Sequence, residues 1–313
     1  ADEPSEAAGD LSEAGTGSTP GSATAPASGE RGGGGTIRLL WWQAPTILNP
    51  HFAQGSKDFD ASSIALTPLA IVDAEGNLIP RLAAEIPSLD NGLVASDGLS
   101  VTWKLRDYVR WHDGEPFTAD DVRFTYEYVT NEATTATTFA TYSSIKSVEV
   151  VDDHTVTLHF TDPNPAWFVP FVGSVGMILP EHVLRDAVGE AARDHPFNLS
   201  PVGTGPYKVV DFRPGDVVVY EINSDYWEPG KPFFDRVEMK GGGDPTSAAR
   251  AVLQTGEVDY ATNLQVEASV LTSLEQSGQG QLVISPGAGV EAILVNFTDP
   301  NTETNGARSE LAV

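Results

Sequence analysis

The order of apolar and polar residues predicts an α/β protein. Residues 36–42 are apolar at both alternating positions with only Arg38 interrupting, which is typical of a strand covered on both faces inside a sheet. Residues 148–160 alternate on either side of Asp152-Asp153-His154 and predict a hairpin. Residues 73–77 predict a second hairpin turn, and further strands are expected at residues 101–105, 207–210, 217–222, 236–240, 258–260, 281–285 and 292–297.

One helix is marked by a start signal and an apolar stripe. Thr118, with Asp121 three residues later, forms a variant of the capping box, and Val122, Tyr126 and Val129 follow at helical spacing. Its carboxylates are expected in the first turn and on the outer face, without acid–base chemistry: Asp120, Asp121 and Glu127.

Glycine and proline residues mark turns and helix ends in the second half of the chain. Residues 201–207, Pro-Val-Gly-Thr-Gly-Pro-Tyr, predict a shaped turn that feeds a strand. Asp244, Pro245 and Gly256 are typical of the N-cap, the first residue and the terminator of a helix. Shorter helical segments are expected at residues 61–69 and from residue 179.

The first 35 residues differ from the rest in composition. They are rich in Gly, Ser, Ala, Pro and Glu and almost free of large apolar side chains, so they cannot bury enough surface to offset the entropy of ordering. We predict a disordered acidic tether. Its place before the first strand suits a lipoprotein linker, with a lipidated cysteine preceding Ala1 as a hypothesis.

Composition excludes several classes of function. A formal net charge of -26 and a pI near 4.3 argue against nucleic-acid binding, which needs a basic face. The chain has no cysteine, which excludes disulfides, cysteine–zinc sites and a thiol nucleophile. No apolar run approaches the roughly 18 residues of a membrane span. No signal peptide is present, so an exported protein would be in a mature or trimmed form.

Few residues suggest site chemistry by themselves. Residues 152–154 could ligate a metal, but side chains at a hairpin tip diverge, and residues 299–310 lack the turn glycine of a calcium loop. Ligands in open α/β sheets bind beyond the carboxyl ends of strands, so the segment from Trp41 and Trp42 to Ser56 is a candidate cleft. The alternative, a core position, is favoured for Trp41 and left open for Trp42.

Several blocks in the same order resemble the bacterial family 5 solute-binding proteins, the peptide, nickel and oligosaccharide receptors of ABC importers. They are Leu-Asn-Pro-His (48–51), Trp-Lys-Leu-Arg (103–106), Trp-His-Asp-Gly-Glu-Pro-Phe-Thr-Ala-Asp-Asp-Val (111–122), Pro-Val-Gly-Thr-Gly-Pro-Tyr (201–207), Asn-Ser-Asp-Tyr-Trp (223–227) and Arg-Ala-Val-Leu-Gln-Thr-Gly-Glu-Val-Asp (250–259). The resemblance covers about residues 35–297.

The resemblance implies an α/β clamp similar to type II periplasmic binding proteins. It suggests a mixed-sheet lobe from residues 36–66 and 181–295, with an inserted small α+β domain at residues 67–180. Residues 296–313 would begin the crossover to a second large lobe, which is expected to be absent from the chain.

Ligand-binding positions also follow from the resemblance alone. Peptide-binding members pair the ligand backbone with an extended segment that matches Gln54, Gly55 and Ser56 here. The other implied positions are Phe139 or Tyr142, Gly173, Asn263, Gly287 and Asn296. Trp42 is a ligand-binding candidate from its place after the first strand. Small residues near Gly287 and the Trp41-Trp42 pair leave room for a sugar ligand.

The implied function is an extracytoplasmic, non-catalytic receptor, possessing no cofactor or metal, that delivers peptides to an ABC permease. It would be a monomer at full length, in the periplasm or at the cell surface. An oligosaccharide receptor of the same family is the alternative. A hydrolase is disfavoured because the zinc-protease helix, the Gly-x-Ser-x-Gly elbow and the phosphate loop are absent. An adhesion or scaffold module is a third hypothesis, favoured only if no solute binds.

Overall fold

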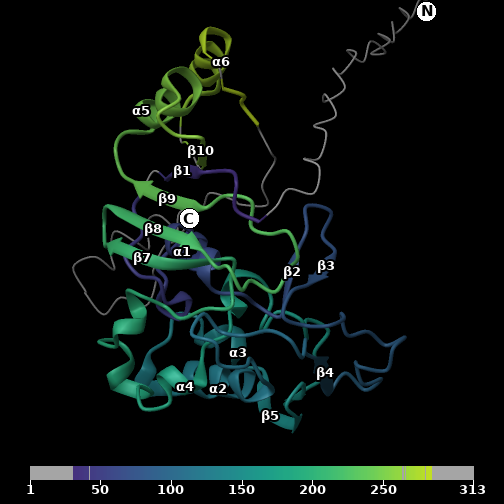
Figure 1. Cartoon of the computed structure of the whole chain (residues 1–313). Coiled ribbons are helices and arrows are strands. Elements are labelled where there is room, and N and C mark those ends of the chain that lie inside the picture. The colour runs from purple at the N-terminus through teal and green to yellow at the C-terminus, as the bar shows by residue number, and fades with distance from the viewer. Residues whose placement is uncertain (1–30, 42, 263, 265, 279, 284–313) are drawn as a thin grey trace, which may run out of the picture.

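A five-stranded mixed sheet forms the centre of the molecule (Figure 1). The computed structural model describes residues 31–41, 43–262, 264, 266–278 and 280–283. The strand order is β10-β1-β9-β8-β7. The strands are β1 (Thr36–Trp41), β7 (Tyr207–Arg213), β8 (Val217–Ile222), β9 (Arg236–Gly241) and β10 (Tyr260–Thr262).

Strand β1 lies inside this sheet, parallel to β9 on one side and to β10 on the other. This confirms the prediction of an interior strand. The prediction that both faces are covered is only partly met, because Trp41 alone is buried along the strand. Ile37 and Leu39 pack with Trp41 against one apolar cluster, whereas Leu40 on the opposite face stays partly exposed among the described residues.

Helix α1 (Ser56–Ala65) packs on the sheet through Ala61 and Ala65. The Tyr220 hydroxyl of β8 donates to the Ala61 carbonyl oxygen at 2.8 Å and fixes the helix on the sheet. The helix begins five residues before the predicted start at residue 61. Its first turn is polar, and buried Asp58 there binds backbone amides, so the apolar period that usually marks a helix is missing.

Two smaller sheets lie outside the main sheet in Figure 1, a two-stranded hairpin beside it and a three-stranded sheet at the bottom of the view. Strands β2 (Ala70–Val72) and β3 (Leu78–Pro80) make one hairpin, and β4 (Ser100–Lys104), β6 (Thr155–Phe160) and β5 (Ile145–Asp152) make an antiparallel sheet. Both predicted hairpins are therefore confirmed. Residues 163–170, which follow β6, form a loop, and Trp167 there packs on Trp103 of β4 with ring centroids 5.8 Å apart.

Helix α2 (Ala119–Thr130) covers the three-stranded sheet and begins after Thr118 as predicted. Val122 and Val129 are buried as expected. Asp121 lies in the first turn and completes the capping box as predicted, but the expectation of an outer-face charge is wrong for it, because the residue is 4% exposed. It accepts hydrogen bonds from Thr118 N, Glu181 N and Trp111 Nε1 at 2.9, 2.9 and 3.1 Å. Burial raises its pKa to about 6 despite these bonds.

The turn at residues 201–207 lies against the end of α1. Gly205 N donates to the Ala65 carbonyl oxygen at 2.9 Å. A Cβ atom on Gly203 would lie 1.8 Å from that oxygen, so only glycine fits there. The turn delivers the chain into β7, as predicted, although β7 continues three residues further and contains an irregular pairing between Val209 and Asp211.

A small helical unit, residues 245–255 and 268–277, flanks β10 at one edge of the main sheet. Helix α5 (Pro245–Arg250) continues as η6 (Ala251–Thr255) and stops at Gly256, whose φ is 67°. Asp244 accepts from Ser247 N at 2.9 Å, so the predicted cap is confirmed. Helix α6 (Ala268–Ser277), which the pattern did not predict, packs on this unit through Leu271 and Leu274. The two last predicted strands lie mostly outside the described residues.

The remaining helices are single turns. They are η1 (Pro50–Phe52), η2 (Glu132–Thr134), α3 (Phe139–Tyr142), η3 (Gly173–Gly176), α4 (Glu181–Leu184), η4 (Gly189–Ala192) and η5 (Pro196–Asn198). Among the described residues, no helix has the length and apolar character needed to cross a membrane.

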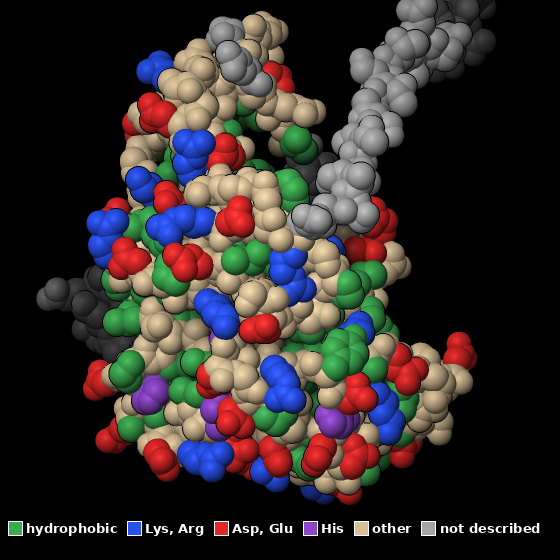
Figure 2. All heavy atoms as spheres, viewed as in Figure 1, with side chains coloured by type: hydrophobic (Ala, Val, Ile, Leu, Met, Phe, Trp, Pro, Cys, Tyr) green, Lys and Arg blue, Asp and Glu red, His purple; other side chains and the backbone are tan. Residues whose placement is uncertain are grey.

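The largest apolar cluster joins the small sheets, α2 and the segment after them. It extends through Leu184 and Phe197, beyond residue 180. The expected domain bounds stay a prediction. Figure 2 shows acidic and basic side chains interspersed over the visible face, so the negative charge is spread rather than gathered in one patch there.

Candidate functional site

Three predicted ligand-binding residues, Gln54, Gly55 and Ser56, form the exposed connection between η1 and α1. Gly55 is the N-cap of α1 with a φ of 129°, a conformation that side-chain-bearing residues rarely adopt. The Gln54 carbonyl oxygen and the Gly55 N–H make no hydrogen bond to any residue that the structure describes. These two backbone groups are therefore free to pair with a ligand.

A buried histidine fixes the base of this loop. His51 Nε2 is 3.0 Å from the Met177 carbonyl oxygen, and Nδ1 is 2.7 Å from Thr138 Oγ1. Because a carbonyl oxygen only accepts, Nε2 carries the proton and Nδ1 accepts from the threonine hydroxyl. Burial lowers the pKa of His51 to about 4, so the ring is neutral at neutral pH.

Two further buried polar side chains hold the same loop. Asn49 donates to Asn198 Oδ1 at 2.9 Å and accepts from His51 N at 3.1 Å. Asp58 accepts from Thr46 N at 2.7 Å and from Gln54 N at 2.9 Å. Burial by itself would raise the pKa of Asp58, but these bonds and the Lys57 ammonium group 2.7 Å away lower it. The loop is thus held from below while its outer surface stays open.

The two aromatic candidates occupy different environments. Tyr142 is fully buried, donates to the Val175 carbonyl oxygen at 3.1 Å and packs edge-on against Phe171 with centroids 5.1 Å apart. Phe139, one turn earlier in α3, is 42% exposed. Of the two, exposure favours Phe139 as the residue that a solute can reach. Gly173, at the start of η3, is partly exposed.

The structure brings these predicted positions together around His51. The Thr137 N–H donates to the His51 carbonyl oxygen at 2.8 Å, which links η1 to the segment before α3. The Met177 carbonyl oxygen on the imidazole and the ring contact with Tyr142, at 6.0 Å, link η1 to the η3 segment and to α3. Gln54 to Ser56, Phe139 and Gly173 therefore belong to three segments that share one buried hub.

Another cluster lies at the carboxyl end of β1. Trp41 is 8% exposed and belongs to the core, as favoured from the sequence. Its indole Nε1 donates to Asp60 Oδ2 at 2.8 Å, and its ring lies 6.1 Å from that of Tyr260, centroid to centroid. Four predicted positions lie outside the described residues: Trp42, Asn263, Gly287 and Asn296.

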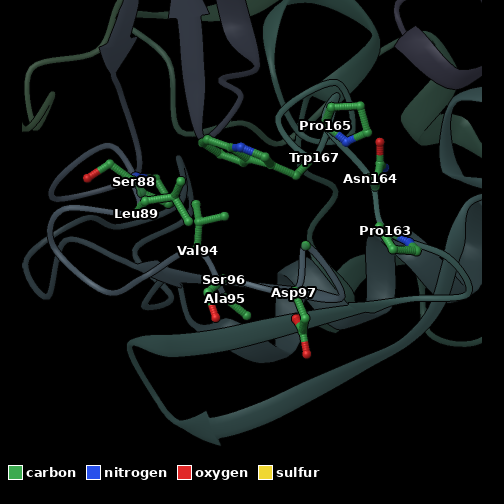
Figure 3. Close-up of a pocket in the computed structure, with 12 residues that line it drawn as sticks. Ser88, Leu89, Val94, Ala95, Ser96, Asp97, Pro163, Asn164, Pro165 and Trp167 are labelled. Carbon is green, nitrogen blue, oxygen red and sulfur yellow. The ribbon is translucent and has the colours of Figure 1, made fainter.

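Two cavities of the described part lie away from these positions. One of about 480 Å³ opens in the small-sheet region, where Leu89, Val94 and Trp167 face Pro163 and Pro165 (Figure 3). A second, of about 290 Å³, separates the β2–β3 hairpin from the loop around Trp227. Neither is lined by a predicted ligand-binding residue. Within the described ranges, no group of three or more acidic or histidine residues is arranged to hold a metal.

Sequence reasoning missed the residues that support the loop. His51 and Asn49 stood in a quoted block but were not assigned a role. Asp58 and Asp60 were not predicted, because the helix was expected to begin only at residue 61 and both lie before that residue. The pairing of Asn49 with Asn198, distant in sequence, leaves no signal in a single chain.

Comparison with known proteins now gives the family. The model for "Bacterial extracellular solute-binding proteins, family 5 Middle" matches residues 77–308. The oligopeptide-binding protein AppA of Bacillus subtilis is 30% identical over 217 residues, which are 69% of this chain and 38% of that protein. Its structure in complex with a nonapeptide matches with a TM-score of 0.70 and 26% identity, covering 79% of this chain and 47% of that one.

Two further solved structures agree. NikZ from Campylobacter jejuni, in complex with Ni(L-His), has a TM-score of 0.64 at 30% identity, covering 77% of this chain and 45% of its own. The ABC transporter substrate binding protein CtaP from Listeria monocytogenes has a TM-score of 0.65 at 26% identity, and the match covers 78% of this chain and 47% of that one. The chain spans less than half the length of each of these proteins.

These matches confirm the predicted fold class, an α/β structure of the type II periplasmic-binding-protein kind with a mixed sheet and smaller sheets. The family is one of extracellular solute-binding receptors. The long match to its model, together with the shared fold, leads to one conclusion: the chain belongs to the bacterial extracellular solute-binding proteins of family 5.

Proposed function

We propose that the whole protein containing this chain is a non-catalytic extracytoplasmic receptor that captures peptides and delivers them to an ABC importer. The observation that carries the proposal is the loop at residues 54–56, an exposed backbone segment supported by buried polar residues, in a chain that belongs to a family of solute receptors. AppA, which shares this fold, is named an oligopeptide-binding protein.

The loop suits backbone recognition. A peptide can add to an open backbone segment through main-chain hydrogen bonds, which are indifferent to the peptide's sequence. The Gln54 carbonyl oxygen and the Gly55 N–H belong to one trans peptide group and point to opposite sides of the chain, so a peptide on either side would find one free group. Phe139 and Gly173, on segments joined through His51, would border the bound peptide. Rigid support lowers the ordering cost on binding.

The proposed partners follow from the same reasoning. CtaP, a structural relative, is described as an ABC transporter substrate binding protein, which supports an ABC permease as the acceptor of the solute. We further propose that the acidic segment at residues 1–35 connects the receptor to a lipid anchor on the cell surface, and that the full-length receptor acts as a monomer.

The test is native mass spectrometry of the full-length protein, purified without refolding, followed by thermal melting with added peptides. Co-purified masses that are lost on denaturation and fit mixed peptides would support the proposal. Peptide-dependent melting without any change in the peptide would support a receptor rather than a hydrolase.

Other results would contradict it. A discrete carbohydrate mass would replace the peptide receptor with an oligosaccharide receptor. Hydrolysis of the added peptide would favour an enzyme. A protein that carries no mass and whose melting temperature no peptide changes would contradict peptide capture.

A further inference from the structure

Two carboxylates of helix α1 differ sharply in their surroundings. Asp58 is fully buried, lies 2.7 Å from the Lys57 ammonium group and accepts backbone hydrogen bonds. Asp60, two residues later, is only partly buried and accepts one hydrogen bond, from the Trp41 indole. No Lys, Arg or His among the described residues forms an ion pair with Asp60, so its second oxygen is available to another donor.

An exposed aromatic ring contacts the same indole that donates to this carboxylate. Tyr260 is 51% exposed, and its ring contacts that of Trp41 at 6.1 Å. Asp60 and Tyr260 therefore contact the same buried indole from two different elements, α1 and β10. An aromatic face and a carboxylate are the two groups that attract an ammonium or guanidinium ion most strongly in proteins.

The position in the fold is that of a ligand site. Trp41 is the last residue of β1, which runs parallel to both β9 and β10. Ligands in α/β sheets bind beyond the carboxyl ends of such strands. The Asp60 carboxylate also lies on the helix that begins at Ser56, at the end of the proposed peptide-binding loop.

Electrostatics points in the same direction. Burial raises the pKa of Asp60, and the indole hydrogen bond only partly opposes this. A carboxylate that has lost part of its hydration without gaining a counter-ion is stabilised when a cation arrives. Asp58 on the same helix already has its cation, Lys57, and has no such need.

We propose that Asp60, with the ring of Tyr260, binds a positively charged group of the captured solute, an ammonium or guanidinium group. This inference rests on the proposed peptide-receptor function and adds a preference for basic peptides. The group can come from a lysine or arginine side chain or from the amino terminus of the peptide.

The experiment measures binding of designed peptides to the full-length protein and to its Asp60→Asn variant by calorimetry. Asparagine keeps the shape and can still accept from the Trp41 indole, so only the charge is removed. One peptide series replaces each lysine by glutamine, and a second series carries an acetylated amino terminus, which separates the two sources of charge.

The wild-type protein should prefer the cationic peptide about tenfold, and Asp60→Asn should abolish that preference while leaving the neutral peptide's affinity unchanged. Tyr260→Leu should reduce the preference about threefold. Asp186→Asn, which removes an exposed carboxylate elsewhere, is the matched control and should change neither value.

Unchanged preference in Asp60→Asn would overturn the inference while leaving peptide capture intact, because the variant would still bind the neutral peptides. Equal loss of cationic and neutral peptides in both Asp60→Asn and Tyr260→Leu would assign these residues a structural role and also overturn it. A wild-type protein that binds neither peptide would remove the proposed function and this inference together.

Discussion

Two irregular segments of this protein are each held by a neutral histidine, His51 being buried and His112 partly buried, yet one segment stays exposed and the other is buried. His51 fixes the loop before α1 and leaves residues 54–56 exposed. His112 accepts from Gly203 N at 3.1 Å and contacts the Gly205 carbonyl oxygen at 3.0 Å, and here Gly203, Thr204 and Gly205 are all buried. The same side-chain chemistry leaves one backbone segment exposed and closes another into the core.

The difference comes from what lies above each segment. The turn at residues 201–207 packs against the end of α1, where Gly205 N donates to the Ala65 carbonyl oxygen and Gly203 N to His112, so the N–H groups of both glycines have partners. The loop at residues 54–56 is held by the buried residues Asn49, His51 and Asp58, and its outer side is exposed. We therefore assign the first a structural role and the second a binding role.

The largest expected effect is on the closed turn. Gly203→Ala places a methyl group 1.8 Å from the Ala65 carbonyl oxygen and should destabilise the fold by about 4 kcal/mol. Urea unfolding measures this. Gly33→Ala is the control, since a Cβ there meets no atom within 4 Å, and it should change the free energy of unfolding by less than about 0.5 kcal/mol. Equal stability of the two variants would contradict the close approach.

Acid should lower the free energy of unfolding, because it protonates the histidines that hold both segments. Burial lowers the pKa values of His51 and His112 to about 4, whereas the unfolded rings titrate near 6.5. The stabilisation that each neutral ring provides is complete above pH 6.5 and is lost as the pH falls toward 4. At pH 5 each ring has lost roughly 2 kcal/mol of its contribution to the free energy of unfolding. Asp121 has its pKa raised to about 6, so it takes up a proton more readily in the folded state. Between pH 7 and 5 this restores roughly 1 kcal/mol of the free energy of unfolding that the histidines lose.

The measurable result is a free energy of unfolding in urea that is roughly 3 kcal/mol lower at pH 5 than at pH 7. The double variant His51→Gln/His112→Gln should show a much smaller difference between the two pH values. Equal stability of the wild-type protein at both pH values would contradict neutral buried rings.

Single histidine variants separate the two roles. His51→Leu and His112→Leu each leave buried polar groups without partners and should each lower the free energy of unfolding by roughly 2 kcal/mol. Solute affinity should fall roughly tenfold for His51→Leu, because the binding loop is displaced, and by less than about twofold for His112→Leu. Calorimetry with full-length protein distinguishes them, and equal affinities would refute the division of roles.

The smallest effect on stability is expected at Phe139. Its ring is 42% exposed, so Phe139→Ala should change the free energy of unfolding by less than about 0.5 kcal/mol. Affinity for solute should still fall measurably if the ring borders the ligand. A matching variant, Leu199→Ala, removes a similarly exposed side chain, at 47%, and should leave affinity unchanged.

Local patterns predicted the elements whose signals lie within a few residues. The cap of α5 by Asp244, the start of α2 after Thr118 and the hairpin of β5 and β6 required only spacing and turn chemistry. The start of α1 was missed because its first turn is polar. Asp121 was misplaced because its partner Glu181 N is 60 residues away, and no local pattern shows such a contact.

For the candidate site, the sequence indicated positions along the chain but not how their side chains are buried or exposed. The resemblance assigned Gln54, Gly55, Ser56, Phe139 and Gly173, and the structure connects their segments. It could not distinguish Phe139 from Tyr142, because exposure depends on how α3 packs on Phe171. The proposed role of Asp60 could not be predicted, because it depends on the contacts that Trp41 makes with Asp60 and with Tyr260, which is distant in sequence.

The most direct test is amide hydrogen exchange of the full-length protein with and without a bound peptide, read at single residues. Our account predicts that peptide slows exchange at Gly55 and Ser56 and leaves Gly203 and Gly205 unchanged, because only the first pair lies on an open backbone. Unchanged exchange at Gly55 and Ser56 in a protein saturated with peptide would contradict the assignment of this loop as the binding site.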